Sequence, residues 1–282
     1  MSSASASQLV WLITDTSSGF GRELALAALN RGDKVIATAR ARSLSSLDGL
    51  KAKGAEAIEL DVTASLDVLK GAAAKAVGIY GKVDILVNNA GYVLNGAMEE
   101  NTPEETQNQF NTNVFGPLNV ARAFLPYMRE RKSGTVIFIG SMAGWIAISN
   151  TGIYAASVSI SLDDEITPLG LRSICIEPGY FRTSLLSGDN RNATVPRIPD
   201  YQAMVEQADA ALSAYHGKQA GDPVKAAEVI VDLGHGVGSF KGKKLPKVLV
   251  LGKDCYDAVK NESEKTLENL EEWKEVSQST DL

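Results

Sequence analysis

The segment 14–21 reads Thr-Asp-Thr-Ser-Ser-Gly-Phe-Gly and lies between an apolar run and a helical pattern. A glycine-bearing turn at such a junction lets the backbone approach a pyrophosphate closely, while the helix N-terminus provides N–H donors and the positive end of its dipole. We therefore expect a dinucleotide to bind here, in contact with Ser17, Ser18, Gly19, Phe20 and Gly21.

Two arginines, Arg40 and Arg42, follow the next apolar run, where the adenosine ribose of a dinucleotide would lie. An acidic residue at this place binds a ribose 2′-hydroxyl, whereas an arginine pairs with a 2′-phosphate. The pattern favours NADP over NAD, and the alternative is a pair of solvated arginines at the end of a strand.

Short apolar runs must position these residues, and they alternate with helical patterns along the chain. Some are continuous, such as Val-Ile-Phe-Ile at 136–139, which is typical of strands covered on both faces. The predicted strands are 9–14, 34–40, 55–60, 84–88, 135–140, 171–177 and 247–251.

Two helical patterns between these strands carry clear end signals. The segment 21–31 ends before Gly32, and another helix opens at Thr102-Pro103-Glu104-Glu105 with a capping box. Alternating strands and helices favour right-handed crossovers. The sequence therefore predicts an α/β fold: a single Rossmann-like domain whose doubly wound parallel sheet of about seven strands has helices on both faces.

Composition excludes several classes of function. The chain has 282 residues, 28 Lys+Arg against 34 Asp+Glu, and a net charge of -6, which argues against nucleic acid and anionic membranes as partners. Its two cysteines and two histidines fit neither a disulfide framework nor metal-ligand spacing, so no metal is expected. The Ser/Ala-rich start is unlike a secretory signal, and we expect a cytoplasmic location.

We divide the chain into a disordered tail at 1–8 and one domain at 9–282. Residues 184–202 are rich in Ser, Asn, Arg and Pro and follow the sixth strand, which indicates either a lid-like loop over the substrate or a plain surface loop. A charged amphipathic helix is expected at 253–276, for packing or subunit contact.

The chain resembles the short-chain dehydrogenase/reductase family along nearly its full length. The resemblance is carried by the order and spacing of several short motifs. They are Ser17-Ser18-Gly19-Phe20-Gly21, Asp61-Val62, Asn88-Asn89-Ala90-Gly91, Asn113, Ser141, Tyr154 and Pro178-Gly179. Within the family, the chain resembles the retinol-dehydrogenase-like subgroup. This resemblance is indicated by residues 11–14, by the segment around 221–223 and by the acidic C-terminal helix.

The resemblance implies an NADP(H)-dependent oxidoreductase that interconverts a carbonyl and an alcohol on a small organic substrate. Ser141 would hold the substrate oxygen, Tyr154 would transfer the proton, and Asn113 would support a proton-relay water. Asp61 would lie at the adenine ring. The other residues that would line the cofactor are Val62, Asn88, Ala90, Gly91, Pro178 and Gly179.

The sequence departs from the family at Asp15, where the family has a glycine directly beneath the cofactor. A side chain narrows the space that close backbone approach requires, and a carboxylate adds like-charge repulsion towards the phosphates. The alternatives are that the loop turns Asp15 outward or that Asp15 caps a turn.

A second departure lies after Tyr154, where the family has a lysine one helical turn on and this chain has Val158. The lysine holds the nicotinamide ribose and lowers the pKa of the tyrosine. The segment 154–170 is also about six residues shorter than in the family, or about 9 Å of helix. A non-redox cyclase or isomerase and a non-catalytic pseudoenzyme are therefore the alternative functions, while the substrate, the direction of reaction and a homo-oligomeric state stay open.

Overall fold

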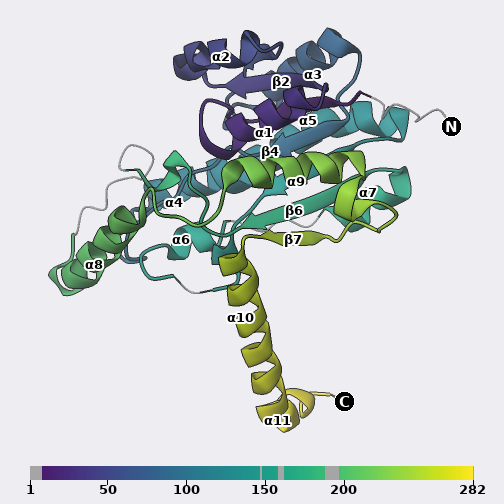
Figure 1. Cartoon of the computed structure of the whole chain (residues 1–282). Helices are drawn as coiled ribbons and strands as arrows, with labels where there is room; N and C mark the ends of the chain where they lie inside the picture. Colours follow the sequence, from purple (N-terminus) through teal and green to yellow (C-terminus); the bar gives the residue numbers. More distant parts are fainter. Residues whose placement is uncertain (1–7, 147, 158–161, 188–196, 282) are drawn as a thin grey trace.

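Seven parallel strands form one sheet in the order β3-β2-β1-β4-β5-β6-β7 (Figure 1). The computed structural model describes residues 8–146, 148–157, 162–187 and 197–281. The doubly wound parallel sheet of about seven strands is thus confirmed. The strands are β1 Val10–Ile13, β2 Lys34–Ala39, β3 Glu56–Glu59, β4 Ile85–Asn88, β5 Thr135–Ile139, β6 Arg172–Pro178 and β7 Val248–Leu251.

Both faces of the sheet are covered, as the continuous apolar runs predict. Along β5, Val136 and Phe138 pack into one core, and Ile137 between them packs into the other. The first core lies under α3 and α5, and the second lies under α1 and α9 (Figure 1). Successive side chains of a strand point to opposite faces, so an uninterrupted apolar run serves both cores at once.

The helices agree with the end signals in the sequence. At the start of α4 the Thr102 hydroxyl accepts from the Glu105 N–H at 3.1 Å, and the Glu105 carboxylate accepts from the Thr102 N–H at 2.8 Å, which is the predicted capping box. The main helices are α1 Gly19–Asn30, α2 Asp48–Lys51, α3 Leu66–Tyr80, α4 Pro103–Phe110, α5 Gly116–Arg131, α6 Gly152–Ala155, α7 Asp163–Ile166, α8 Pro199–Tyr215, α9 Pro223–His235, α10 Lys253–Glu272 and α11 Lys274–Gln278.

Some predicted boundaries are wrong. Helix α1 begins at Gly19 rather than at residue 21, because Ser18 already serves as its N-cap. Of the segment 184–202, residues 184–186 form a short 3-10 helix and α8 starts at Pro199, while 188–196 lie outside the described residues. In the predicted tail 1–8, Gln8 donates to the Gly32 carbonyl, and 1–7 lie outside the described residues.

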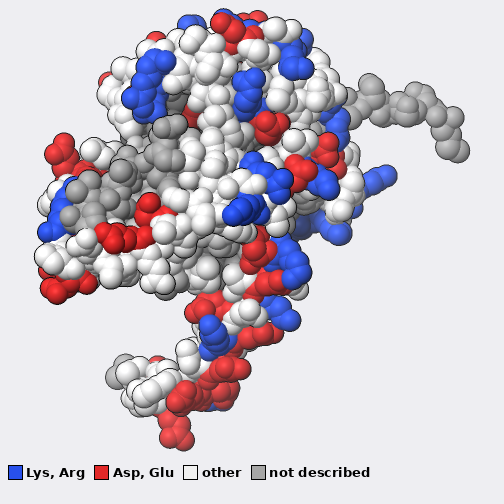
Figure 2. Space-filling view, turned by 60° about the vertical axis from the view of Figure 1, so that its left-hand side comes forward, with Lys and Arg blue, Asp and Glu red and all other residues white. Residues whose placement is uncertain are grey.

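The C-terminal helix expected at 253–276 is broken at Trp273 into α10 and α11. It projects from the body of the molecule and carries acidic and basic side chains along much of its length (Figures 1 and 2). Its base is anchored beside the sheet, where the Asp254 carboxylate accepts from the Tyr180 N–H at 2.7 Å and the Cys255 thiol donates to the Glu177 carbonyl. Burial raises the pKa of that thiol to about 12.

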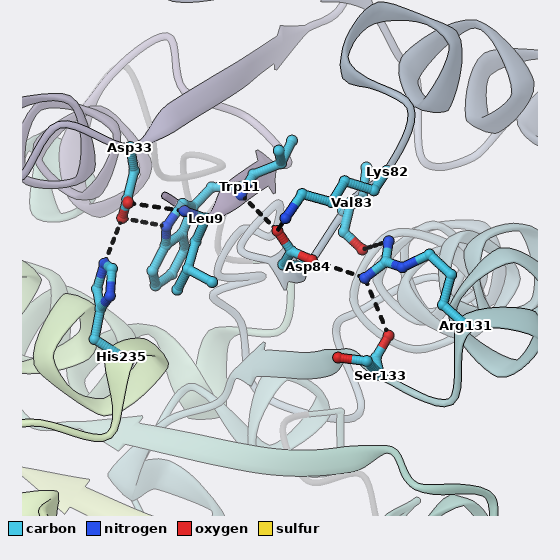
Figure 3. Close-up of polar contacts among 10 residues, drawn as sticks. Leu9, Trp11, Asp33, Lys82, Val83, Asp84, Arg131, Ser133 and His235 are labelled. Carbon is cyan, nitrogen blue, oxygen red and sulfur yellow. Dashed lines mark hydrogen bonds and ion pairs between the residues drawn. The ribbon is translucent and has the colours of Figure 1, made fainter. Parts of the chain in front are cut away.

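Two buried aspartates, Asp33 and Asp84, directly precede β2 and β4 at the amino ends of the strands (Figure 3). Asp33 accepts hydrogen bonds from the Leu9 N–H, from the Trp11 indole at 2.9 Å and from His235 at 2.7 Å. Asp84 pairs with Lys82 and Arg131, both at 2.7 Å. These contacts tie β1 to α9 and β4 to α5, away from the predicted site.

We expect Asp33→Asn to lower the free energy of unfolding by roughly 1–3 kcal/mol. The amide nitrogen of asparagine would face donors, so at least one buried N–H would lose its acceptor. Urea denaturation measures the change, with Asp67→Asn as the control because the Asp67 carboxylate is exposed and paired only with Lys70 at the surface. Equal stability of the Asp33 variant and the parent would contradict the assigned role.

Candidate active site

A cleft of about 780 Å³ opens at the carboxyl ends of the strands, where ligands bind in doubly wound sheets. It brings together most of the residues that the sequence singles out. Those lining it are Ser18, Gly19, Phe20, Arg40, Asp61, Val62, Asn88, Ala90, Gly91, Asn113, Ser141, Tyr154, Pro178 and Gly179. Ser17 and Gly21 do not line the cleft, and they shape the turn behind it instead.

The turn between β1 and α1 requires glycine at position 21. A Cβ there would lie 2.3 Å from the Asp15 carbonyl oxygen and 2.5 Å from Nδ2 of Asn89, so a larger residue would displace the backbone. Gly19 has φ +55°, which favours glycine. Ser18 is the N-cap of α1 and makes no side-chain bond to its first turn, and Ser18, Gly19 and Phe20 line the cleft, so the N-terminus of α1 borders it.

Asn89 fixes this turn against the next loop of the site. Its amide nitrogen donates to the carbonyls of Thr14 at 2.9 Å and Asp15 at 3.0 Å. In return, the Thr14 hydroxyl accepts from the N–H groups of Asn89 and Ala90, both at 2.9 Å. The ends of β1 and β4 are therefore held in one register on the floor of the cleft.

Asp15 lies in the left-handed region, with φ +52°, which explains why a glycine suits this position. Its carboxylate accepts a hydrogen bond from the Ser17 hydroxyl at 2.6 Å and so stabilises the turn, as one of the sequence alternatives states. Asp15 also lines the cleft. Its negative charge therefore stays beside the N-terminus of α1, where phosphate would bind.

We expect Asp15→Gly to tighten the binding of a dinucleotide by roughly 5- to 30-fold, because like charge is removed and the backbone is relieved. Asp15→Asn is the matched control, since asparagine keeps the shape and tolerates a positive φ but has no charge. Calorimetric titration compares the three proteins. If neither variant binds more tightly than the parent, the carboxylate does not oppose the phosphates.

Asp61 and the two arginines occupy the other end of the cleft. Burial of the Asp61 carboxylate would raise its pKa, but hydrogen bonds from the Thr63 hydroxyl and N–H, with the charges of Arg40 and Arg42, hold the pKa below its usual value. Asp61 is thus an anionic acceptor near neutral pH. Both guanidinium groups are exposed at the same edge, as a 2′-phosphate would require.

Asn88 provides a test of whether a polar ligand fits this cleft. The side chain is 3% exposed, and neither its oxygen nor its nitrogen has a hydrogen-bond partner within the described residues. Buried amides are nearly always satisfied, so an orphaned one at the cleft wall points to a bound polar group. The residues present fit a dinucleotide in this respect.

Tyr154 lies in α6 and Ser141 follows β5, and both side chains line the cleft close enough for the Ser141 hydroxyl to affect the pKa of Tyr154. Ser141 also accepts from the Ala143 N–H at 3.1 Å, which orients its oxygen. Burial raises the pKa of Tyr154, and the Ser141 hydrogen bond only partly opposes this effect. Tyr154 is therefore protonated at neutral pH and is suited to donate a proton.

Asn113 lies in a π-helical turn, Asn111–Phe115, between α4 and α5. Its amide exchanges hydrogen bonds with the backbone of Tyr92 at 3.2 and 3.0 Å and donates to the Ser157 hydroxyl at 3.2 Å. Ser157 in turn donates to the Tyr154 carbonyl at 2.7 Å. Asn113 thus braces the segment that carries Tyr154, and its part in a proton relay stays a prediction.

The arginines near Tyr154 in the sequence are engaged elsewhere. Arg172 pairs with Asp163, Arg182 donates to the Gln219 carbonyl, and Arg197 forms a fork with Glu105. The last contact holds the pKa of Glu105 at about 2. Val158, which stands where the family has its lysine, and Arg191 lie outside the described residues.

A second cavity of about 100 Å³ adjoins the cleft and is lined mostly by apolar side chains. Met142, Ile148, Phe181, Leu186 and Leu212 contribute to its walls. Ser141 and Tyr154 line both cavities, so the hydroxyl pair lies where the two spaces meet.

Several lining residues are missed by sequence reasoning. Thr183 lines both cavities although it falls outside the motifs, and Leu212 reaches the small pocket from α8, far along the chain. Leu185, which also lines both, lies within the segment 184–202 that the sequence gives as a possible lid-like loop over the substrate. Asn89 lies within the motif Asn88-Asn89-Ala90-Gly91, so its place next to a residue expected at the cofactor could have indicated a part in the site. No local pattern marks Thr183 and Leu212, because tertiary packing alone brings them to the site.

Comparisons with known proteins agree with this geometry. A family model described as short chain dehydrogenase matches residues 9–194. The chain is 31% identical over 278 residues to the oxidoreductase BOA17 of Botryotinia fuckeliana, covering 95% of this chain and 97% of that protein. A short-chain dehydrogenase from Streptomyces avermitilis superimposes with a TM-score of 0.84 at 38% identity, covering 98% and 99% of the two chains.

A serine dehydrogenase complexed with NADP+ is also similar, with a TM-score of 0.68 and 25% identity over 86% of this chain and 94% of that one. The chain belongs to the short-chain dehydrogenase family, and it is an oxidoreductase of that family by descent.

Proposed function

We propose that the protein is an NADP(H)-dependent oxidoreductase that interconverts a carbonyl and an alcohol on a small organic substrate. The observation that carries this proposal is the Ser141–Tyr154 hydroxyl pair at the junction of a dinucleotide-sized cleft and a small apolar pocket. The cleft has the volume and polar lining for a dinucleotide, while the small pocket suits the uncharged part of a substrate.

Each residue has a defined part in the proposed reduction. Ser141 holds the carbonyl oxygen, and Tyr154 donates its proton to that oxygen as negative charge develops there. Residues that line the cleft, among them Arg40 and Asp61, would hold NADPH, which would supply the hydride for this reduction. Because Tyr154 keeps its proton at neutral pH, we propose reduction as the favoured direction.

Cofactor choice tests the proposal through Arg40. We expect NADPH to bind roughly 10- to 100-fold more tightly than NADH, since a charge-assisted phosphate contact contributes about 1.5–3 kcal/mol. Arg40→Ala is expected to weaken NADPH binding and leave NADH binding unchanged. Arg129→Ala is the control, because Arg129 is exposed and lies outside the cleft. Equal affinities of the parent for the two cofactors, measured by calorimetry, would rule out the assignment.

The alternative is a non-redox cyclase or isomerase, or a non-catalytic pseudoenzyme, on the same scaffold. Val158 in place of the family lysine and the shortened segment after Tyr154 favour it. Binding of NADPH without turnover on any carbonyl compound would support this alternative. The retinol-dehydrogenase-like subgroup stays a prediction as well.

We also propose a cytoplasmic enzyme that acts on a small molecule. None of the helices within the described ranges combines the length and hydropathy of a membrane span.

Self-association is part of the proposal, because Leu267, Leu270 and Trp273 on the projecting helix are all more than half exposed. A second copy of this chain could offer its lysine-rich segment 241–247 to the acidic outer half of that helix, and sedimentation velocity of the parent and of Leu270→Glu would test this assembly.

A further inference from the structure

Asn95 is a buried polar side chain that lines the small pocket. It is 4% exposed, and both its amide oxygen and its amide nitrogen lack a hydrogen-bond partner among the described residues. An unsatisfied buried amide costs roughly 1–3 kcal/mol, so its presence in an apolar pocket calls for a ligand.

The backbone on both sides of Asn95 is fixed. The Leu94 N–H donates to the Gln109 side chain at 2.9 Å, and the Gly96 N–H donates to the Asn150 carbonyl at 3.0 Å. Gly96 has φ +148°, and a Cβ there would lie 2.2 Å from Oδ1 of Asn101. These contacts fix the backbone at residue 95 within the pocket wall, so that only the side-chain torsions of Asn95 direct its amide.

The rest of the pocket restricts what Asn95 can bind. No lysine, arginine, histidine, aspartate or glutamate is among the described residues that line it. The hydroxyl of Thr151, on the same wall, already donates to the Ile148 carbonyl at 2.9 Å. A charged group would be buried without a counter-ion, which is strongly unfavourable, whereas an uncharged oxygen could accept from the Asn95 amide.

The volume sets the size of the group. The pocket holds about 100 Å³, and an apolar cavity of about 150 Å³ is known to accommodate benzene. The part of the substrate beyond the reacting carbonyl is thus a short arm of about six non-hydrogen atoms at most, comparable to benzene.

Taken with the function proposed above, on which this inference rests, we infer that Asn95 determines substrate specificity. The substrate is a carbonyl compound with a short apolar arm that carries a second, uncharged oxygen. Ser141 and Tyr154 hold the reacting carbonyl at the pocket mouth, and Asn95 donates a hydrogen bond to the second oxygen at the wall.

Three ketones of similar length test the inference. Methyl 4-oxopentanoate carries an uncharged ester group, heptan-2-one has methylene groups in its place, and 4-oxopentanoate carries a charged carboxylate instead of the ester. Binding is measured by ligand-observed NMR, with and without saturating NADP+, so that turnover is not needed. We expect the ester to bind at least about tenfold more tightly than either of the other two. In Asn95→Leu the preference over heptan-2-one should disappear.

Thermal unfolding distinguishes recognition from a structural role. Leucine has nearly the shape of asparagine and removes the unsatisfied amide, so Asn95→Leu should melt at the same temperature as the parent or higher. Asn30→Leu is the control, because Asn30 is exposed at the end of α1 and lines neither the cleft nor the pocket.

Three results would overturn the inference: equal binding of ester and heptan-2-one by the parent, retention of the preference in Asn95→Leu, or a fall of several degrees in its melting temperature. Failure of all three ketones to bind would also overturn it. If the Asn95-dependent preference holds but NADPH is neither bound nor oxidised, the pocket assignment stands and the proposed oxidoreductase function fails.

Discussion

Tyr154→Phe is expected to lower kcat for NADPH-dependent carbonyl reduction about a thousandfold. The substitution removes only the hydroxyl that interacts with Ser141, so the aromatic packing and the binding of NADPH should be retained. Steady-state kinetics and calorimetry on the same samples separate the two effects. Tyr127→Phe is the control, since Tyr127 packs against the core under α5 and away from the cleft.

The pH dependence follows from the direction of the pKa shift. Burial raises the pKa of Tyr154 above its usual value near 10, and the Ser141 hydrogen bond opposes this only in part. The proton donor is thus present throughout the neutral range, and the rate of reduction should be level there and fall only above about pH 10. A profile that declines between pH 6 and 8 would contradict Tyr154 as the donor.

Val158→Lys is expected to restore only a small part of the activity typical of the family, about tenfold at most, in the oxidation of alcohols. A lysine four residues after Tyr154, as in the family, would lower the pKa of the tyrosine and favour its action as a base. The shortened segment remains, however, and an error of about 1 Å in the reacting geometry costs about a hundredfold. In the structure, Tyr154 lies in the four-residue helix α6, and the next described helix is α7, Asp163–Ile166.

A variant that combines Val158→Lys with insertion of six residues after it should therefore exceed the point variant by about a hundredfold. Val158→Met, which has similar length without charge, is the control for packing. Alcohol oxidation with NADP+ is the measurement. Full recovery by Val158→Lys alone would show that the missing ammonium is the only defect and that the geometric explanation is wrong.

Much of the fold follows from local sequence signals. The continuous apolar runs at β1 and β5 predict strands that face two cores, and Thr102 and Glu105 predict the start of α4 from capping chemistry alone. The break at Trp273 has no such signal, because the helical pattern continues through it. The start of α8 at Pro199 is also missed, since the preceding sequence is rich in Ser, Asn, Arg and Pro and has no helical periodicity.

The site is predictable where motifs follow strands. Asp61, Asn88 and Ser141 each stand at or just after the carboxyl end of a strand, and the parallel sheet gathers them at one edge. Asn95 could not be found in this way. Its importance comes from an unsatisfied amide in an apolar pocket, which depends on contacts from residues far apart in the chain. The role of Asp15 likewise needed its φ angle and its bond to Ser17.

The most direct test of the proposed carbonyl reduction follows a deuterium label from NADPH to the product during turnover. The protein is incubated with NADPH deuterated at both C4 positions and with methyl 4-oxopentanoate, and the product is analysed by mass spectrometry and NMR. We expect one deuterium on the new carbinol carbon for each NADPH consumed, with Tyr154→Phe reducing the rate about a thousandfold. Conversion of the ketone without consumption of NADPH, or an alcohol without deuterium at that carbon, would contradict the proposed function.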